Sequence, residues 1–96
     1  MNMEAQKYEN RGVNVFYQNE LFKTRIIVLG AKEKIPECEM ETYVMFYVVS
    51  GEVLLRRNGE SSTLRENQLF ITEPASLSME TTLGARLLGV QIKVRP

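Results

Sequence analysis

The sequence predicts a single all-β domain, and three features of the chain support that prediction. Short segments rich in β-branched and aromatic residues follow one another at spacings of roughly 8–12 residues. Glycine, asparagine and proline separate these segments where turns are expected. No segment shows a convincing helical period. The 96 residues suffice for one hydrophobic core and leave little room for a second, so we expect one domain over residues 1–96.

The N-terminal third of the chain changes from a polar segment to two short strands. Residues 1–11 carry charges and amides without a hydrophobic period, which is typical of a flexible or peripheral arm. Residues 13–17 alternate in polarity and are expected to form a strand. Residues 24–29 are apolar and β-branched, which indicates a second strand. A charged loop is expected at residues 31–36.

The longest apolar run follows this loop. Residues 37–49 are expected to be extended over a length that allows a bend or a β-bulge. A turn at residues 50–51 should lead into a strand at 52–57. The Asn58-Gly59 pair then favours a type I′ hairpin, because both residues accept positive φ. Further strands are expected at residues 60–65, 68–72, 76–81 and 85–94.

Composition argues against several classes of function. The 12 basic and 12 acidic residues balance, so the charge indicates neither a nucleic acid nor an anionic membrane as partner. The longest apolar run is far shorter than the ~20 residues of a membrane helix. A single cysteine allows no internal disulfide, and this favours a cytoplasmic location. The absence of histidine removes the commonest general base and metal ligand, and with them a hydrolase triad.

Several short motifs occur in a fixed order in the middle of the chain. Ile35-Pro36 precedes the long strand, and residues 47–53 have the sequence Tyr-Val-Val-Ser-Gly-Glu-Val. The Asn58-Gly59 hairpin and the segment 66–71, Glu-Asn-Gln-Leu-Phe-Ile, come next. With these features the chain resembles the cupin superfamily from Gly30 to Ile92. The resemblance implies a double-stranded β-helix, or jelly-roll, barrel.

The residue types at the metal-binding positions of cupins are changed in this chain. Metal-binding cupins carry two histidines and a glutamate before the glycine of the first motif, and a histidine in the second. Counting back from Gly51 places Val44 at the glutamate position. The first two histidine positions fall on Cys38 and Met40, or at a longer spacing on Glu37 and Glu39. The last histidine position falls on Leu77 or Met79.

Strand parity indicates which of these residues face the barrel interior. Even-numbered residues from Cys38 to Val48 share one face, and odd-numbered residues from Glu37 to Tyr47 share the other. A barrel interior is expected to be apolar, so the even-numbered set faces inward. We therefore expect no metal, no cofactor and no catalytic residue, and an apolar ligand pocket lined by Cys38, Met40, Val44, Phe46, Leu77 and Met79.

Two metal-binding alternatives remain open. The sulfur atoms of Cys38, Met40 and Met79 suit a soft ion such as Cu(I). Carboxylates at residues 37, 39 and 41 suit a hard cation. Each pattern is more often structural: sulfur residues fill cores, and alternate glutamates form a solvated face.

The outward face of the central strand is too apolar for open water. Tyr43, Met45 and Tyr47 lie on it, and either the strand at residues 13–17 or a second copy of the protein is expected to cover it. The resemblance to cupins favours the second copy. We expect a homodimer through this face.

Three functions are compatible with these features. The first is a small-molecule binding or regulatory module with an apolar barrel pocket and no catalytic activity. The second is a cupin-type metalloenzyme, such as a dioxygenase or isomerase, with unusual Glu or Cys/Met ligands. The third is a structural or interaction protein that acts through its dimer surface.

Overall fold

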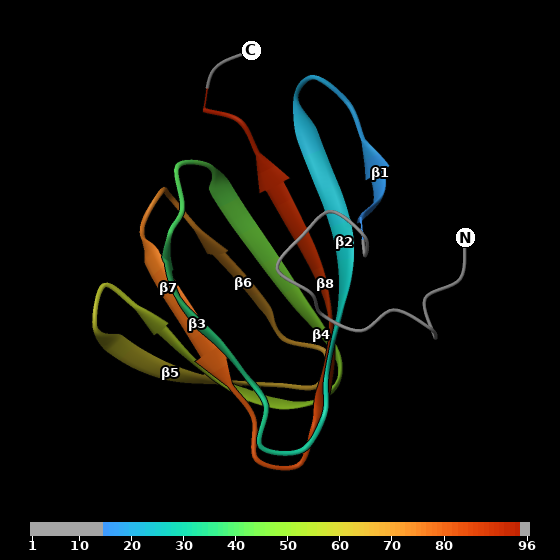
Figure 1. The fold of residues 1–96 in the computed structure, drawn as a ribbon, viewed down its shortest axis with the longest axis vertical. Coiled ribbons are helices and arrows are strands. Elements are labelled where there is room, and N and C mark those ends of the chain that lie inside the picture. Colours follow the sequence, from blue (N-terminus) through green and yellow to red (C-terminus); the bar gives the residue numbers. More distant parts are fainter. Residues whose placement is uncertain (1–14, 95–96) are drawn as a thin grey trace.

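The computed structural model describes residues 15–94, and every regular element within them is a β-strand. All strand pairs are antiparallel, and the strands curl into a half-barrel (Figure 1). The all-β prediction is confirmed. The strands are β1 (Val15–Gln18), β2 (Phe22–Leu29), β3 (Lys34–Glu39), β4 (Tyr43–Arg57), β5 (Glu60–Arg65), β6 (Leu69–Thr72), β7 (Ser76–Glu80) and β8 (Ala85–Ile92).

Strand β4 belongs to both layers of the barrel. Its first part pairs with β8 on one side and with β6 on the other. Its second part pairs with β5 and β7. The two layers therefore have the strand orders β1-β2-β8-β4-β6 and β3-β7-β4-β5. Figure 1 shows β4 running alongside β8 and then curving toward β5.

The long central strand differs from the prediction at two points. The extended segment expected at residues 37–49 is divided, because β3 ends at Glu39 and residues 40–42 connect it to β4. The turn expected at residues 50–51 does not form, and β4 continues to Arg57. A register shift between Val48 and Ser50 bends the strand instead. A β-bulge thus replaces the turn, and it lets one strand serve both layers.

Gly51 is the residue at which β4 crosses from one layer to the other. Its φ is 84°, a backbone conformation that L side chains rarely adopt. A Cβ atom at this position would lie 2.3 Å from the carbonyl oxygen of Gly84 and 2.8 Å from the Cα of Ala85. Both obstacles are backbone atoms, so they cannot rotate away as a side chain does. The close approach of these two backbone segments requires glycine at position 51.

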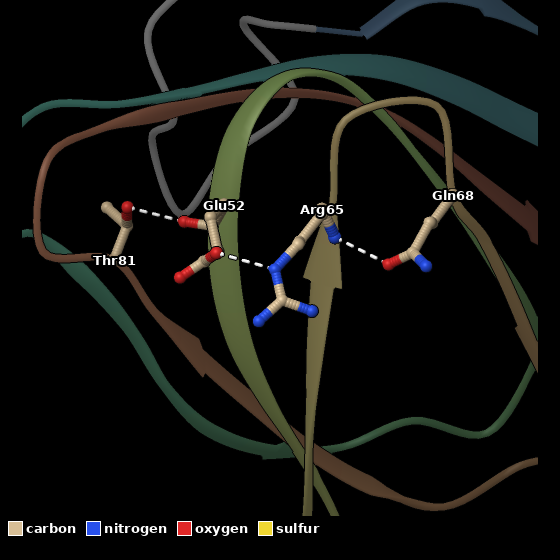
Figure 2. Close-up of polar contacts among 4 residues, drawn as sticks. All are labelled: Glu52, Arg65, Gln68 and Thr81. Carbon is tan, nitrogen blue, oxygen red and sulfur yellow. Dashed lines mark hydrogen bonds and ion pairs between the residues drawn. The ribbon is translucent and has the colours of Figure 1, made fainter.

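Hydrogen bonds fix the same crossing from both sides (Figure 2). The buried Thr81 hydroxyl donates to the carbonyl oxygen of Glu52 at 2.7 Å and accepts from the N–H of Gly84 at 3.0 Å. On the other side of β4, the Glu52 carboxylate pairs with Arg65 Nε at 3.0 Å. The N–H of Arg65 donates to Gln68 Oε1 at 2.7 Å. The Glu52–Arg65 pair is exposed and contributes little, so Thr81 is the main polar tie.

The Asn58-Gly59 hairpin joins β4 to β5 as predicted. The two residues have φ of 50° and 86°, the positive values that a type I′ turn requires. The Asn58 side chain also accepts a hydrogen bond from the N–H of Ser76 at 2.9 Å. The hairpin is thereby tied to the start of β7.

The hydrophobic core fills the barrel on the Gly51 side. Facing residues of β2, β8 and β4 form layers, and Ile27, Leu87 and Val48 make one such layer. Each of these three side chains is at most 2% exposed. The core cluster consists of Ile27, Leu29, Val48, Val53, Leu55, Leu64, Met79, Ala85 and Leu87.

The N-terminal strand does not cover the outer face of β4. Within the described residues, β1 pairs with β2 at the edge of its sheet, and β2 and β8 separate it from β4. The rest of the predicted strand, residues 13–14, and the predicted arm at residues 1–11 lie outside the described part of the chain. Among residues 15–94, no helix is long and apolar enough to cross a membrane.

The crossing at Gly51 gives a first prediction. The substitution Gly51→Ala is expected to lower the free energy of unfolding by about 3 kcal/mol or more, because backbone strain and a steric clash add together. Urea denaturation monitored by circular dichroism measures this loss.

The matched control is Gly59→Ala. Gly59 has nearly the same φ, 86°, but a Cβ there meets no atom within 4 Å. Its loss is expected to be only about 1–2 kcal/mol, from backbone strain alone. Equal losses in the two variants would show that the close approach to Gly84 and Ala85 does not matter.

Candidate functional site

A cavity of about 170 Å³ lies between the two layers of the barrel, next to the hydrophobic core. Along the paired strands, the core layer of Ile27, Leu87 and Val48 is followed by a layer of Arg25, Gly89 and Phe46. The cavity lies at this second layer, on the side of the core away from Gly51. Its wall includes strands from both layers.

Gly89 leaves room for the cavity because it has no side chain. A Cβ atom at this position would lie 3.3 Å from Ile27 Cδ1 and 3.5 Å from both Arg25 Cγ and Phe46 Cε1. These three side chains therefore meet above the bare backbone of β8. Any larger residue would occupy part of the space that they enclose.

The structure brings all six predicted pocket residues to this one cavity. Val44, Leu77 and Met79 are buried, whereas the other three are half-buried. Cys38 faces Leu77 across the β3–β7 pair. The role of the six residues in ligand binding remains a prediction. The six residues are Cys38, Met40, Val44, Phe46, Leu77 and Met79.

Three polar residues of the cavity wall, Arg25, Ser78 and Gln91, are missing from the sequence-based prediction. Arg25 on β2 and Gln91 on β8 lie on the inward faces of their strands, and Arg25 Nη2 donates to Gln91 Oε1 at 3.4 Å. Arg25 Nε is buried and has no hydrogen-bond partner in the part of the chain that the structure describes. The period-two alternation of Arg25 with Ile27 and Leu29 is the sequence signal that identifies the arginine as an inward residue.

The side chains at the cupin metal positions do not fit a histidine-and-glutamate centre. The chain contains no histidine, and Val44 stands at the glutamate position. Glu37 and Glu39 are exposed rather than part of the cavity wall. Within residues 15–94, no three His, Cys, Asp or Glu side chains come together in a way that would hold a metal ion.

The outer face of β4 carries an apolar strip that extends onto the neighbouring strands. Tyr43 lies opposite Ile92 of β8, and Met45 lies opposite Ile71 of β6. Ile71 is 64% exposed, which is unusual for a strand residue of this size. Tyr47 is half-buried and donates through its hydroxyl to Asn67 Oδ1 at 2.7 Å. We call this surface the outer strip, and it consists of Tyr43, Met45, Tyr47, Leu69, Ile71 and Ile92.

Comparison with solved structures identifies the fold. An RmlC-like cupin from Shewanella frigidimarina has a TM-score of 0.77 and 17% identity, covering 84% of this chain and 74% of that one. The cupin domain of Schizosaccharomyces pombe Cnp3 has a TM-score of 0.77 and 14% identity, covering 82% of this chain. This chain spans only 61% of the Cnp3 structure.

A third similar structure is that of an enzyme. Salicylate 1,2-dioxygenase from Pseudoaminobacter salicylatoxidans, solved as an adduct with gentisate, has a TM-score of 0.70 and 16% identity. The match covers 75% of this chain and 20% of the enzyme. No protein-family model matches the chain, and no curated protein sequence matches it. The chain has the cupin fold, which confirms the resemblance seen in its motifs.

The inward position of Cys38 gives a second prediction. Cys38→Ser is expected to lower the free energy of unfolding by about 1 kcal/mol, because a hydroxyl gains less than sulfur from an apolar wall. The adjacent Glu39→Gln, on the exposed face, is expected to change it by less than about 0.5 kcal/mol. Urea denaturation of both variants checks this. A larger loss in Glu39→Gln would reverse the assignment of the two faces of β3.

Proposed function

We propose that the protein is a small-molecule binding module that holds its ligand in the barrel cavity. The observation that carries this proposal is the cavity itself, which has largely apolar walls and a hydrogen-bonded polar pair, Arg25 and Gln91, at one place. Ligand sites in proteins commonly have this composition, because apolar walls supply affinity and a few polar groups set the orientation.

The size of the cavity limits the ligand to a small molecule. An apolar protein cavity of roughly 150 Å³ binds benzene. The cavity here, of about 170 Å³, has room for one ring or a short branched chain with a small polar group.

The comparisons support small-molecule binding without indicating a reaction. One similar barrel, the salicylate 1,2-dioxygenase, was solved with gentisate. The alternative function, a cupin-type metalloenzyme such as a dioxygenase or isomerase, would require metal ligands. The cavity wall offers one thiol and two thioethers, from Cys38, Met40 and Met79, in place of the histidines of the cupin motifs. A binding role requires only the apolar wall and the polar pair.

We further propose that two copies of the chain associate through the outer strip. Several of its side chains are strongly exposed, with Leu69 at 52% and Ile71 at 64%. Burial of such a continuous apolar surface favours association. The dimer is a separate proposal from the ligand site, because the strip and the cavity lie on opposite faces of β4.

Ligand binding is tested with two small probes, nitrobenzene and benzoate. At least one is expected to cause saturable shifts of backbone amide resonances in the cavity strands, measured by two-dimensional NMR. Gly89→Ala is expected to weaken this binding at least threefold, because its Cβ enters the cavity between Ile27, Arg25 and Phe46.

The matched control for this variant is Gly30→Ala. A Cβ at Gly30 meets only the flexible side chain of Glu33, so binding should be unchanged. If neither probe shifts the cavity resonances of the unmodified protein at millimolar concentration, the proposed function is wrong.

Dimer formation is tested by the substitution Ile71→Lys. The unmodified protein is expected to sediment as a dimer in analytical ultracentrifugation, and Ile71→Lys as a monomer, because a charge at the most exposed residue of the strip opposes its burial. Leu83→Lys is the control. Leu83 is 89% exposed in the β7–β8 loop and lies outside the strip, so this variant should stay dimeric. A monomeric unmodified protein at high concentration would contradict the proposal.

A further inference from the structure

Arg25 is the only charged side chain of the cavity wall among the described residues, and no group of opposite charge balances it. The two ion pairs formed within residues 15–94 are Arg56–Glu80 and Arg65–Glu52, and neither includes Arg25. Its one hydrogen bond goes to a neutral amide oxygen at 3.4 Å, close to the limit of a useful bond. Within residues 15–94, the half-buried guanidinium of Arg25 therefore lies beside an apolar cavity without a carboxylate partner.

Such an arrangement costs folding free energy. A charged group removed from water loses hydration that only an opposite charge or several hydrogen bonds can replace. The buried Nε of Arg25 has no acceptor among residues 15–94. An apolar residue at this position would pack against Phe46 and Ile27 without that cost. The position thus carries a group that is unfavourable for the empty barrel and favourable for a ligand of negative charge.

The neighbouring amide adds donors of the same kind. Gln91 Oε1 accepts from Arg25, so the amide nitrogen of Gln91 is the part left to donate. No hydrogen bond from this nitrogen to any part of residues 15–94 is formed. Arg25 and Gln91 together therefore present more N–H donors than free acceptor positions. A ligand group that matches them has acceptor oxygens and negative charge, which are the properties of a carboxylate.

We infer that the ligand is a small organic monoanion, with its carboxylate at the guanidinium of Arg25 and its apolar part against Phe46 and Val44. This inference rests on the proposed function, because it assigns a chemical class to the ligand of the same cavity. One positive side chain in the wall matches one negative charge. The rest of the wall is apolar apart from Gln91 and Ser78 and has no second charged side chain, so a second charged group on the ligand would lose its hydration without a charged partner.

The test compares benzoate with nitrobenzene, which has nearly the same shape but no charge. Dissociation constants are measured by NMR titration at neutral pH. In the unmodified protein, benzoate is expected to bind at least tenfold more tightly than nitrobenzene. Arg25→Met keeps an unbranched, flexible side chain but removes the guanidinium and its charge. It should weaken benzoate binding at least tenfold and change nitrobenzene binding less than about threefold.

Arg86→Met provides the matched control. Arg86 is also half-buried with a buried Nε that has no partner, but it lies on the outer face of β8 and outside the cavity wall. Its substitution should leave both dissociation constants unchanged. If Arg25→Met does not fold, Arg25→Lys replaces it. This variant keeps the positive charge but loses the planar guanidinium. Its affinity for benzoate should fall less than tenfold and should still be higher than its affinity for nitrobenzene.

The outcomes separate the two levels of the proposal. If nitrobenzene binds as tightly as benzoate, or if Arg25→Met leaves benzoate binding unchanged, the carboxylate inference is overturned and the cavity remains a binding site for neutral molecules. If neither probe binds, the proposed function fails, and the inference fails with it. A benzoate preference that depends on Arg25 and not on Arg86 supports both.

Discussion

The barrel depends on the close approach of two backbones at Gly51. Strand β4 can join both layers only because it bends there, and the bend places its backbone against Gly84 and Ala85. Thr81 then ties the β7–β8 connection to Glu52 on the same strand. A sheet without such a bend would remain open and flat, and its inner face would not close over a core.

The cavity follows from how the layers of side chains continue away from this bend. The first layers beyond it hold Leu29, Val48 and Leu87, which meet and fill the interior. At the next layer Gly89 has no side chain and Arg25 carries a charge, so the same strands no longer fill the space between them. The barrel is therefore packed at one end and hollow at the other. A single fold thus combines a packed core and a candidate ligand cavity on the same strands.

Much of the fold was predictable from local sequence patterns, since turns and alternation are local properties. The Asn58-Gly59 hairpin, the cupin resemblance and the inward parity of Cys38 and Val44 all depend on a few neighbouring residues. The continuous course of β4 was not predictable, because Ser50-Gly51 has the composition of a turn and only the contact with Gly84 shows that it is a bulge. Arg25 and Gln91 were missed for a similar reason. They come from strands far apart in sequence, and each is of a residue type that is usually exposed to solvent.

The central claim is that the hollow end of the barrel holds a small carboxylate beside Arg25. A crystal structure of the protein with benzoate tests it most directly. The account predicts density for the ring against Phe46 and Val44, with the carboxylate within hydrogen-bond distance of the Arg25 guanidinium. Side chains that fill this space and leave no void for the ring, or a ring bound with its carboxylate turned away from Arg25, would contradict the account.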